Sequence, residues 1–193
     1  MSTDAESVEL VGDEVAGNVA RAVLFAALVG AFAYVSFPYP LSPAPVTLQV
    51  LGVFLAGALL GPVWGGAAMV LYLAAGVVGL PVFAGGDAGL GVLIGPTGGY
   101  LLAYPPAAMA VGAVVHGGLS LDDHRAAGLA RLIVAMAAGT AVVYGMGAVG
   151  LYVFLEYGVA TAVLQGAVVF LPAEALKAAA AVGVVRSDAV TAA

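Results

Sequence analysis

Long apolar stretches make up most of this chain, and short segments rich in polar residues, proline or glycine separate them. An α-helix needs roughly 20 mostly apolar residues to cross a bilayer, so these stretches predict membrane-spanning helices. We expect six spans and a short connecting helix before the last one. The spans cover residues 19–37, 47–60, 63–80, 99–115, 129–155 and 172–186, and the connecting helix covers 159–171.

Proline and glycine mark the predicted breaks. The run "FPYPLSPAPV" has four prolines within eight residues after the first span, which forbids a regular helix there. Gly61–Pro62 separates the second span from the third, because proline suits the first position of a new helix. "LPVFAGGDAGLGVLIGPTGG" predicts a glycine-rich loop, and the polar run "HGGLSLDDHRAAG" has to lie outside the bilayer.

Composition agrees with this pattern. Of 193 residues, 63% are hydrophobic and only 8% are charged, and the mean hydropathy is +1.13. A soluble domain of this size could not cover its surface with so few polar residues. The sequence therefore predicts an all-α integral membrane protein with six transmembrane helices in one bundle, over residues 19–187. Residues 1–18 are expected to form an acidic cytoplasmic tail and residues 188–193 a second, short one.

The few basic residues predict the orientation in the cell membrane. In the six-span topology Arg21, Arg125, Arg131 and Arg186 lie on the side of the two termini, and the opposite loops contain no Lys or Arg. The positive-inside rule then places both termini in the cytoplasm. The N-terminal run "STDAESVELVGDEV" has five acidic residues and lacks the basic start and apolar core of a signal peptide, so we expect a solvated tail.

The sequence offers little enzymatic chemistry. There is no cysteine, only two histidines occur, and no catalytic triad spacing or phosphate-binding glycine motif is visible. We expect no metal site, no cofactor, no nucleic-acid partner and no catalytic activity. The irregular loops opposite the termini have to be buried in protein or line a cavity where they reach membrane depth. They are therefore candidate walls of an outward-facing pocket.

The charged pair in "VFLPAEALKAAAAVG" is the strongest candidate for ligand chemistry. Glu174 and the single lysine, Lys177, are three residues apart and share a helix face, with Glu174 in the first turn. Ionisable side chains within membrane spans usually mark the path of a ligand or an ion. The alternative is an internal ion pair that only allows both groups to exist in an apolar bundle.

Further polar and small residues are less specific. Asp87 is the only charge in the glycine-rich loop, and it is either a ligand contact or an ordinary exposed residue. Gln49 either faces a pocket or bonds a neighbouring helix. Four residues could line an apolar pocket, although interfacial belts and helix contacts are commoner roles for them: Trp64, Tyr72, Tyr100 and Tyr104. The first span carries alanines at helical spacing that allow another helix to approach: Ala22, Ala26, Ala27 and Ala31.

Three motifs together resemble the BioY family, the biotin-specific substrate-binding (S) components of energy-coupling-factor (ECF) transporters. They are "PAPVTLQVLGVFLAGALLGPVWG", "GLPVFAGGDAGLGVLIGPTGGYLLAYP" and "FLPAEALK". The resemblance implies a six-helix subunit in the lipid bilayer that takes up biotin from outside. It also implies a transmembrane coupling protein and two ATPase subunits as partners, since this chain lacks a nucleotide-binding motif. The alanines of the first span would meet the coupling protein.

The resemblance also implies a set of substrate-binding residues. They are Thr47, Gln49, Phe83, Asp87, Tyr100, Glu174 and Lys177. Lys177 would pair with the biotin carboxylate, while Glu174 or Asp87 would accept from the ring nitrogens; alternatively, Glu174 mainly neutralises Lys177. This chain departs from the family in two places. "PAE" replaces "PGD" ahead of the lysine, and Leu101 follows Tyr100 where some members have a basic residue.

Two other functions are compatible with the residues themselves. The chain could be an S component for another vitamin, which direct binding to a panel of vitamins would reveal. A non-transport membrane scaffold or a channel is the second alternative. A channel should carry rings of charge or carbonyl groups along a continuous pore.

Overall fold

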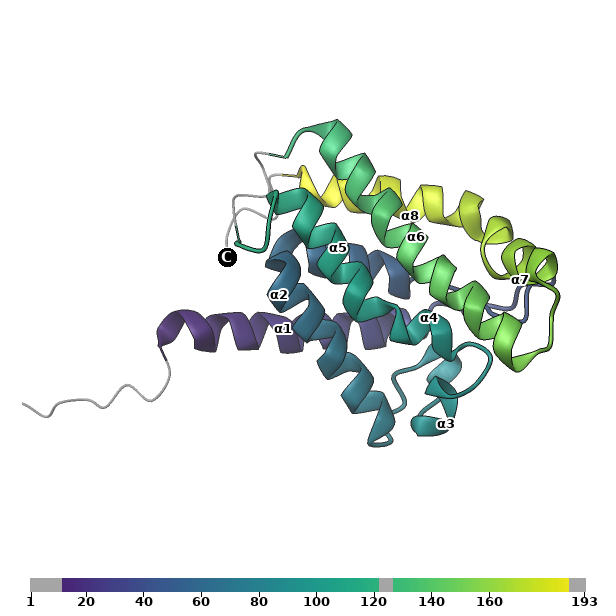
Figure 1. Ribbon diagram of the computed structural model, residues 1–193. Helices are drawn as coiled ribbons and strands as arrows, with labels where there is room; N and C mark the ends of the chain where they lie inside the picture. The colour runs from purple at the N-terminus through teal and green to yellow at the C-terminus, as the bar shows by residue number, and fades with distance from the viewer. Residues whose placement is uncertain (1–11, 122–126, 188–193) are drawn as a thin grey trace, which may run out of the picture.

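The computed structural model describes residues 12–121 and 127–187. This part of the chain is almost entirely helical, as predicted (Figure 1). The α-helices are α1 (Asp13–Phe32), α2 (Gln49–Val77), α3 (Leu90–Leu93), α4 (Gly98–Leu102), α5 (Tyr104–His116), α6 (Leu129–Phe154), α7 (Val159–Gly166) and α8 (Leu171–Val185). Two 3₁₀ turns, η1 (Ala84–Gly86) and η3 (Val168–Phe170), and two short strands, β1 (Ser36–Phe37) and β2 (Val46–Thr47), complete the described elements.

The first helix differs from the predicted span at both ends. It begins at Asp13, inside the segment that we expected to be a tail, and it ends at Phe32. Asp13 and Glu14 fall in its first turn, where the helix dipole favours acidic side chains. Beyond α1 the chain forms an antiparallel ladder, with Ser36 opposite Thr47 and Phe37 opposite Val46. This ladder closes the proline-rich loop at the entrance to α2.

A sharp reversal divides α2 at the predicted break. Gly61 has φ 74° and ψ 179°, a conformation that favours glycine, and Pro62 has no N–H to continue the helix. The chain changes direction there, and the two halves of α2 contact each other close to the break. A Cβ atom at Gly65 would lie 2.8 Å from the Ala56 carbonyl oxygen, so only glycine allows this contact.

Five helical segments of the described residues are long and apolar enough to cross a bilayer: Asp13–Phe32, Gln49–Val77, Gly98–His116, Leu129–Phe154 and Val159–Val185. Because Gln49–Val77 folds back on itself at Gly61, this arrangement agrees with six predicted crossings. The short connecting helix is also present. It is α7, and η3 joins it to α8, which has Pro172 in its first turn.

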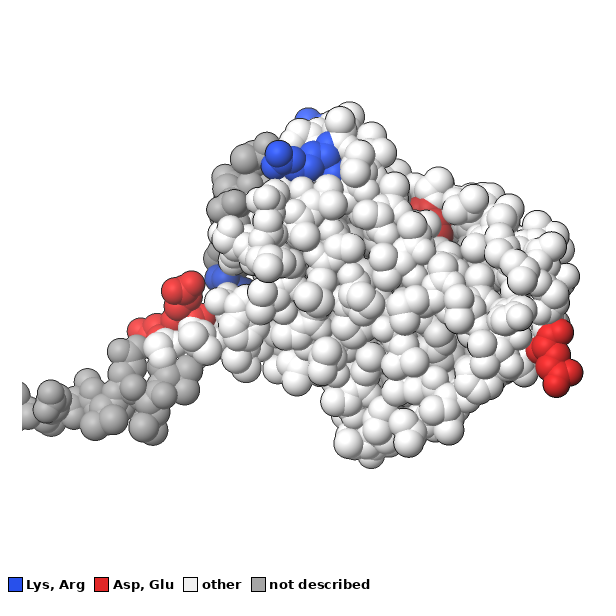
Figure 2. Space-filling view, in the orientation of Figure 1, with Lys and Arg blue, Asp and Glu red and all other residues white. Residues whose placement is uncertain are grey.

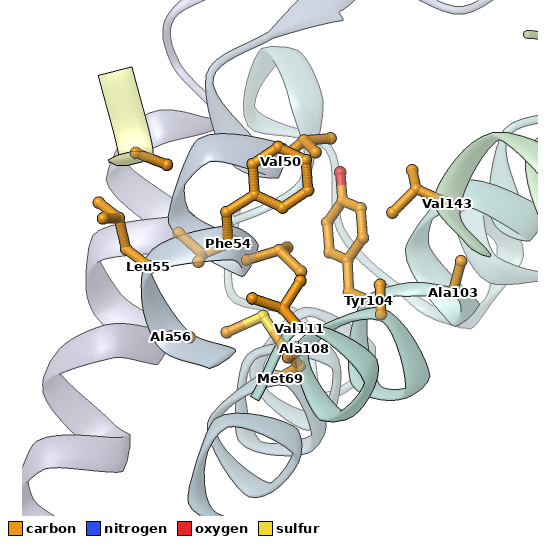
Figure 3. Packing of buried hydrophobic residues seen from close by; sticks show 14 of the residues in the cluster. Val50, Phe54, Leu55, Ala56, Met69, Ala103, Tyr104, Ala108, Val111 and Val143 are labelled. Carbon is orange, nitrogen blue, oxygen red and sulfur yellow. The ribbon is translucent and has the colours of Figure 1, made fainter. Parts of the chain in front are cut away.

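The core lies where both halves of α2 meet α5 and α6. Phe54, Met69 and Val111 are buried there, and Figure 3 shows them packed close to Tyr104. Large apolar side chains on the outer surfaces are exposed instead, for example Leu24 at 67% and Leu176 at 75%. A bilayer accommodates such side chains, because they face lipid there.

The described arginines gather at one end of the molecule. Arg21 lies in α1, Arg131 near the start of α6 and Arg186 directly after α8. On the face shown in Figure 2, the Lys and Arg atoms appear only toward the end where α1 begins and α8 ends. The fourth arginine of the orientation argument, Arg125, lies outside the described residues. The described arginines thus lie together at one end, which is the arrangement that the six-span topology predicts for them.

Candidate ligand-binding site

A cavity of about 240 Å³ lies at the other end of the bundle, near the starts of α2 and α8. Its walls come from the proline-rich loop, the glycine-rich loop and four helical regions. The lining residues are Pro43, Ala44, Pro45, Thr47, Gln49, Val50, Phe83, Ala84, Asp87, Val92, Thr97, Tyr100, Leu101, Tyr104, Val143, Tyr144, Phe170 and Lys177. The volume lies just below the usual range of about 300–1,000 Å³ for small-molecule pockets. Ten of the 18 lining residues are apolar, and polar side chains from several segments lie among them, as a pocket for a small molecule with polar groups requires.

Six of the seven predicted substrate-binding residues line this cavity. They come from segments far apart in the sequence, with Thr47 at the end of β2, Gln49 at the start of α2 and Lys177 in α8. Glu174 is not among the lining residues. It is 2% exposed, and it reaches the cavity through its contacts with two lining residues, Lys177 and Tyr144.

A chain of hydrogen bonds holds the Gln49 side chain. The Thr47 hydroxyl donates to Gln49 Oε1 at 3.0 Å, and Gln49 Nε2 donates to the Tyr72 hydroxyl oxygen at 2.5 Å. Tyr72 donates in turn to the carbonyl of Val82 in the glycine-rich loop at 3.1 Å. All three side chains are buried. The amide of Gln49 is therefore held at both of its ends.

A second network surrounds the ion pair. Lys177 Nζ and the Tyr144 hydroxyl both donate to Glu174 Oε1, the latter at 2.5 Å. Glu174 Oε2 is buried and has no hydrogen-bond partner among the described residues. A buried charge without a partner costs several kcal/mol, so each member of the pair needs the other in this buried position. An ammonium group has three hydrogens, and the bond to Glu174 uses one of them.

Aromatic rings form the apolar wall next to Lys177. The rings of Tyr144 and Phe170 lie 5.2 Å apart between centroids, and Tyr100 meets both rings edge-on, at 5.8 and 6.2 Å. The Tyr100 hydroxyl donates to the Gly166 carbonyl at 2.7 Å, which ties α4 to the end of α7. Figure 3 shows the Tyr104 hydroxyl between Val50 and Val143, which continue this wall.

The glycine-rich loop is built around Phe83. Its ring fills the space above Gly76, where a Cβ atom would lie 2.1 Å from the ring, so the contact needs glycine. The Phe83 N–H donates to the Asp87 carbonyl at 3.0 Å, and the Gly89 N–H donates to the Gly76 carbonyl at 2.7 Å. These bonds fix the loop on α2. The Asp87 side chain itself is exposed at the rim of the cavity.

Residues 3–192 match the profile of the BioY family. The chain belongs to this family. A protein named "Biotin transporter BioY" from Rhodobacter capsulatus is 39% identical over 73% of this chain and 72% of its own length. A relative of the same name from Thermotoga maritima is 40% identical over 62% of this chain and 69% of its own length.

A solved structure is also similar to this BioY-family fold. Its title is "Crystal structure at 2.1 A of the S-component for biotin from an ECF-type ABC transporter". It superposes with a TM-score of 0.79 and 26% identity, over 92% of this chain and 93% of that chain. The all-helical membrane fold that we predicted is confirmed by this match.

Sequence reasoning missed several lining residues of this BioY-family site. Tyr144 and Phe170 were not singled out, although Tyr144 is one of few hydrogen-bonding side chains in the apolar run of α6. Tyr100 and Tyr104 line the cavity, which was one of the roles considered for them. Tyr72 lies behind the wall, and Trp64 is not among the lining residues.

The four alanines of α1 fall on different sides of the helix. Ala22 is completely buried, and Ala26 is half-buried against the core. Ala27 and Ala31 are exposed. Only this second pair therefore presents a surface of small side chains that a partner helix can approach.

Proposed function

We propose that this chain is the substrate-binding membrane subunit of an ECF-type transporter and that it captures biotin in the cavity near the starts of α2 and α8. The observation that carries the proposal is the single cavity in which Lys177, Gln49 and four other residues marked by the family resemblance meet. Membership of the BioY family supports biotin as the substrate. The chain's role is binding, and ATP chemistry belongs to the partner subunits.

The two networks suit the two ends of biotin. Biotin has a carboxylate at the end of an apolar chain and a ureido ring, with one carbonyl and two N–H groups, at the other end. Lys177 pairs with the carboxylate, and the rings of Tyr100, Tyr144 and Phe170 cover the apolar chain. Gln49, supported by Thr47, meets the ureido ring, with Asp87 accepting from a ring N–H at the rim.

Glu174 has a different role in this proposal. Because it contacts Lys177 and lies outside the cavity wall, it holds and neutralises the lysine before the ligand arrives. Of the two roles considered from the sequence, the burial of Glu174 favours this one. The longer side chain of Glu, compared with the Asp of the family motif, then affects the position of Lys177 instead of a contact with the ring.

The proposal also covers the setting of the protein. The arginine-bearing end faces the cytoplasm, so both termini lie inside the cell and the cavity opens outward. Ala27 and Ala31 in α1 face a transmembrane coupling protein, which joins the subunit to two ATPase subunits. The exposed small side chains of this pair support the assignment, since close helix approach requires them.

Ligand binding by the purified protein tests the proposal. Calorimetry in detergent should show saturable binding of biotin and none of thiamine, riboflavin or folate at equal concentrations. Lys177→Ala should weaken biotin binding by roughly 10-fold or more, because a hydrogen bond between charged groups is lost. Arg186→Ala removes a charge at the opposite end and should leave the affinity unchanged. Binding of another vitamin in place of biotin would refute the substrate assignment.

A further inference from the structure

Tyr72 lies behind the cavity and connects two of its walls. The side chain is 1% exposed and is not among the lining residues. Its hydroxyl group sits between Gln49 Nε2, at 2.5 Å, and the Val82 carbonyl oxygen, at 3.1 Å. Tyr72 belongs to the second half of α2, Gln49 to the first half, and Val82 to the glycine-rich loop. One phenol thus joins three separate segments.

The single hydrogen of this phenol fixes the direction of the whole chain of bonds. When Tyr72 donates to the Val82 carbonyl, its oxygen can only accept from Gln49, so Nε2 has to face Tyr72. Oε1 then faces Thr47 and accepts from its hydroxyl group. With the amide turned over, Tyr72 would donate to Oε1, and the Val82 carbonyl would lose this donor. The loop carbonyl therefore selects one of the two orientations of the amide.

The orientation of the amide matters for the cavity. In the selected orientation one N–H and one lone pair of the Gln49 amide bind protein, and the second N–H and the second lone pair of Oε1 remain for a ligand. A ureido ring presents both an acceptor and donors. If the Gln49 amide were turned over, its NH₂ group would face an N–H of the ureido ring and its oxygen would face the ureido carbonyl.

We propose that Tyr72 is a positioning residue for ligand recognition, because its hydroxyl group fixes the Gln49 amide in one orientation. The inference rests on the proposed contact between Gln49 and the ureido ring. Tyr72 thus influences ligand recognition without touching the ligand. Through its bond to Val82, recognition of the ureido ring also depends on the position of the glycine-rich loop.

The surroundings of Tyr72 allow its hydroxyl group to be tested alone. The ring packs edge-on against Phe83, at 5.7 Å between centroids and an interplanar angle of 75°, and it lies 6.0 Å from the ring of Tyr104. Tyr72→Phe keeps these contacts and removes only the hydroxyl. Tyr34→Phe is a matched control, because the Tyr34 hydroxyl donates at 2.6 Å to Pro81, next to Val82, without reaching Gln49.

The experiment is a double-mutant cycle read by biotin calorimetry on the full-length protein. Tyr72→Phe should weaken biotin binding by roughly 3- to 10-fold, the worth of one hydrogen bond. In the Gln49→Ala background the same change should cost less than about 2-fold, since residues that act through one another are not additive. Tyr34→Phe should stay within about 2-fold in both backgrounds. Melting temperatures confirm that each variant is folded.

Three results would overturn the inference. If Tyr72→Phe lowers the biotin affinity by the same factor with and without the Gln49 side chain, Tyr72 does not act through Gln49 and only supports the fold. If Tyr34→Phe lowers the biotin affinity as much as Tyr72→Phe does, any hydrogen bond that anchors the glycine-rich loop would explain the loss, and the Gln49 amide would not. An unchanged affinity in Gln49→Ala alone would remove the ring contact on which the inference rests. In that last case biotin binding that still depends on Lys177 would leave the proposed function standing.

Discussion

The carboxylate of Glu174 is bonded through one oxygen and left without a donor at the other. Both Lys177 and Tyr144 donate to Oε1, while Oε2 is buried without a partner among the described residues. Burying an ion pair is costly, and each further hydrogen bond to its atoms offsets part of that cost. Tyr144 therefore helps to keep the pair in place, and it does so from a different helix.

Tyr144→Phe tests this dependence. The ring would still pack on Phe170 and Tyr100, but Glu174 would lose one of its two donors. The free energy of unfolding should fall by about 1.5–3 kcal/mol, the net worth of a hydrogen bond to a charged group. In a chain of this size each kcal/mol lowers the melting temperature by about 2–4 °C. Tyr152→Phe removes an exposed hydroxyl from the same helix and serves as the control. Identical melting of both variants would show that the Tyr144 hydroxyl contributes nothing.

Single residues differ in how far the sequence predicts them. Glu174 and Lys177 are recognisable because charge is rare in an apolar chain and because they are three apart on one helix. Tyr72 and Tyr144 act on partners 23 and 30 residues away, on other helical segments. Such contacts depend on how the helices pack, which the local pattern does not specify.

At the scale of elements, breaks with a local cause were predicted and boundaries set by distant contacts were not. Gly61–Pro62 ends the first half of α2 because of its own backbone chemistry. The carbonyl of Ala58, which would normally bond to an N–H at position 62, instead accepts from His116 Nε2 at 3.0 Å. α1 ends early, at Phe32, and the chain beyond it forms β1, whose partner β2 lies about ten residues further along the chain. Apolar residues alone give no sign of that pairing.

Ala27 on the exposed side of α1 and Ala22 on the buried side should respond differently to replacement by a bulky residue. Ala27→Trp should leave biotin binding intact and abolish uptake in cells that contain the coupling module, because a bulky side chain prevents close approach of a partner helix. Ala22→Trp should destabilise the protein itself, since position 22 is completely buried and overpacking strains a core. Radiolabelled biotin uptake and binding to the purified variants measure the two effects. Normal uptake by folded Ala27→Trp would show that this surface of α1 is not an interface.

For the whole molecule, the separation of arginines and cavity predicts which end faces the cytoplasm. Single cysteines at Ser42, in the proline-rich loop, and at Ser187, after α8, report on the two ends. The natural chain has no cysteine, so no other site reacts. An impermeant thiol reagent should label position 42 in intact cells, and position 187 only after the membrane is opened. The reverse pattern would invert the proposed orientation.

The central claim is that Lys177 captures the carboxylate of biotin in this cavity. Calorimetry with biotin and with biotin amide, on the natural protein and on Lys177→Met, tests it most directly. The variant should lose roughly 10-fold or more affinity for the acid beyond any loss for the amide, because only the acid offers the ammonium a charged partner. Arg186→Met should change neither affinity. Equal losses for acid and amide in Lys177→Met would contradict the account and leave Lys177 as a partner of Glu174 alone.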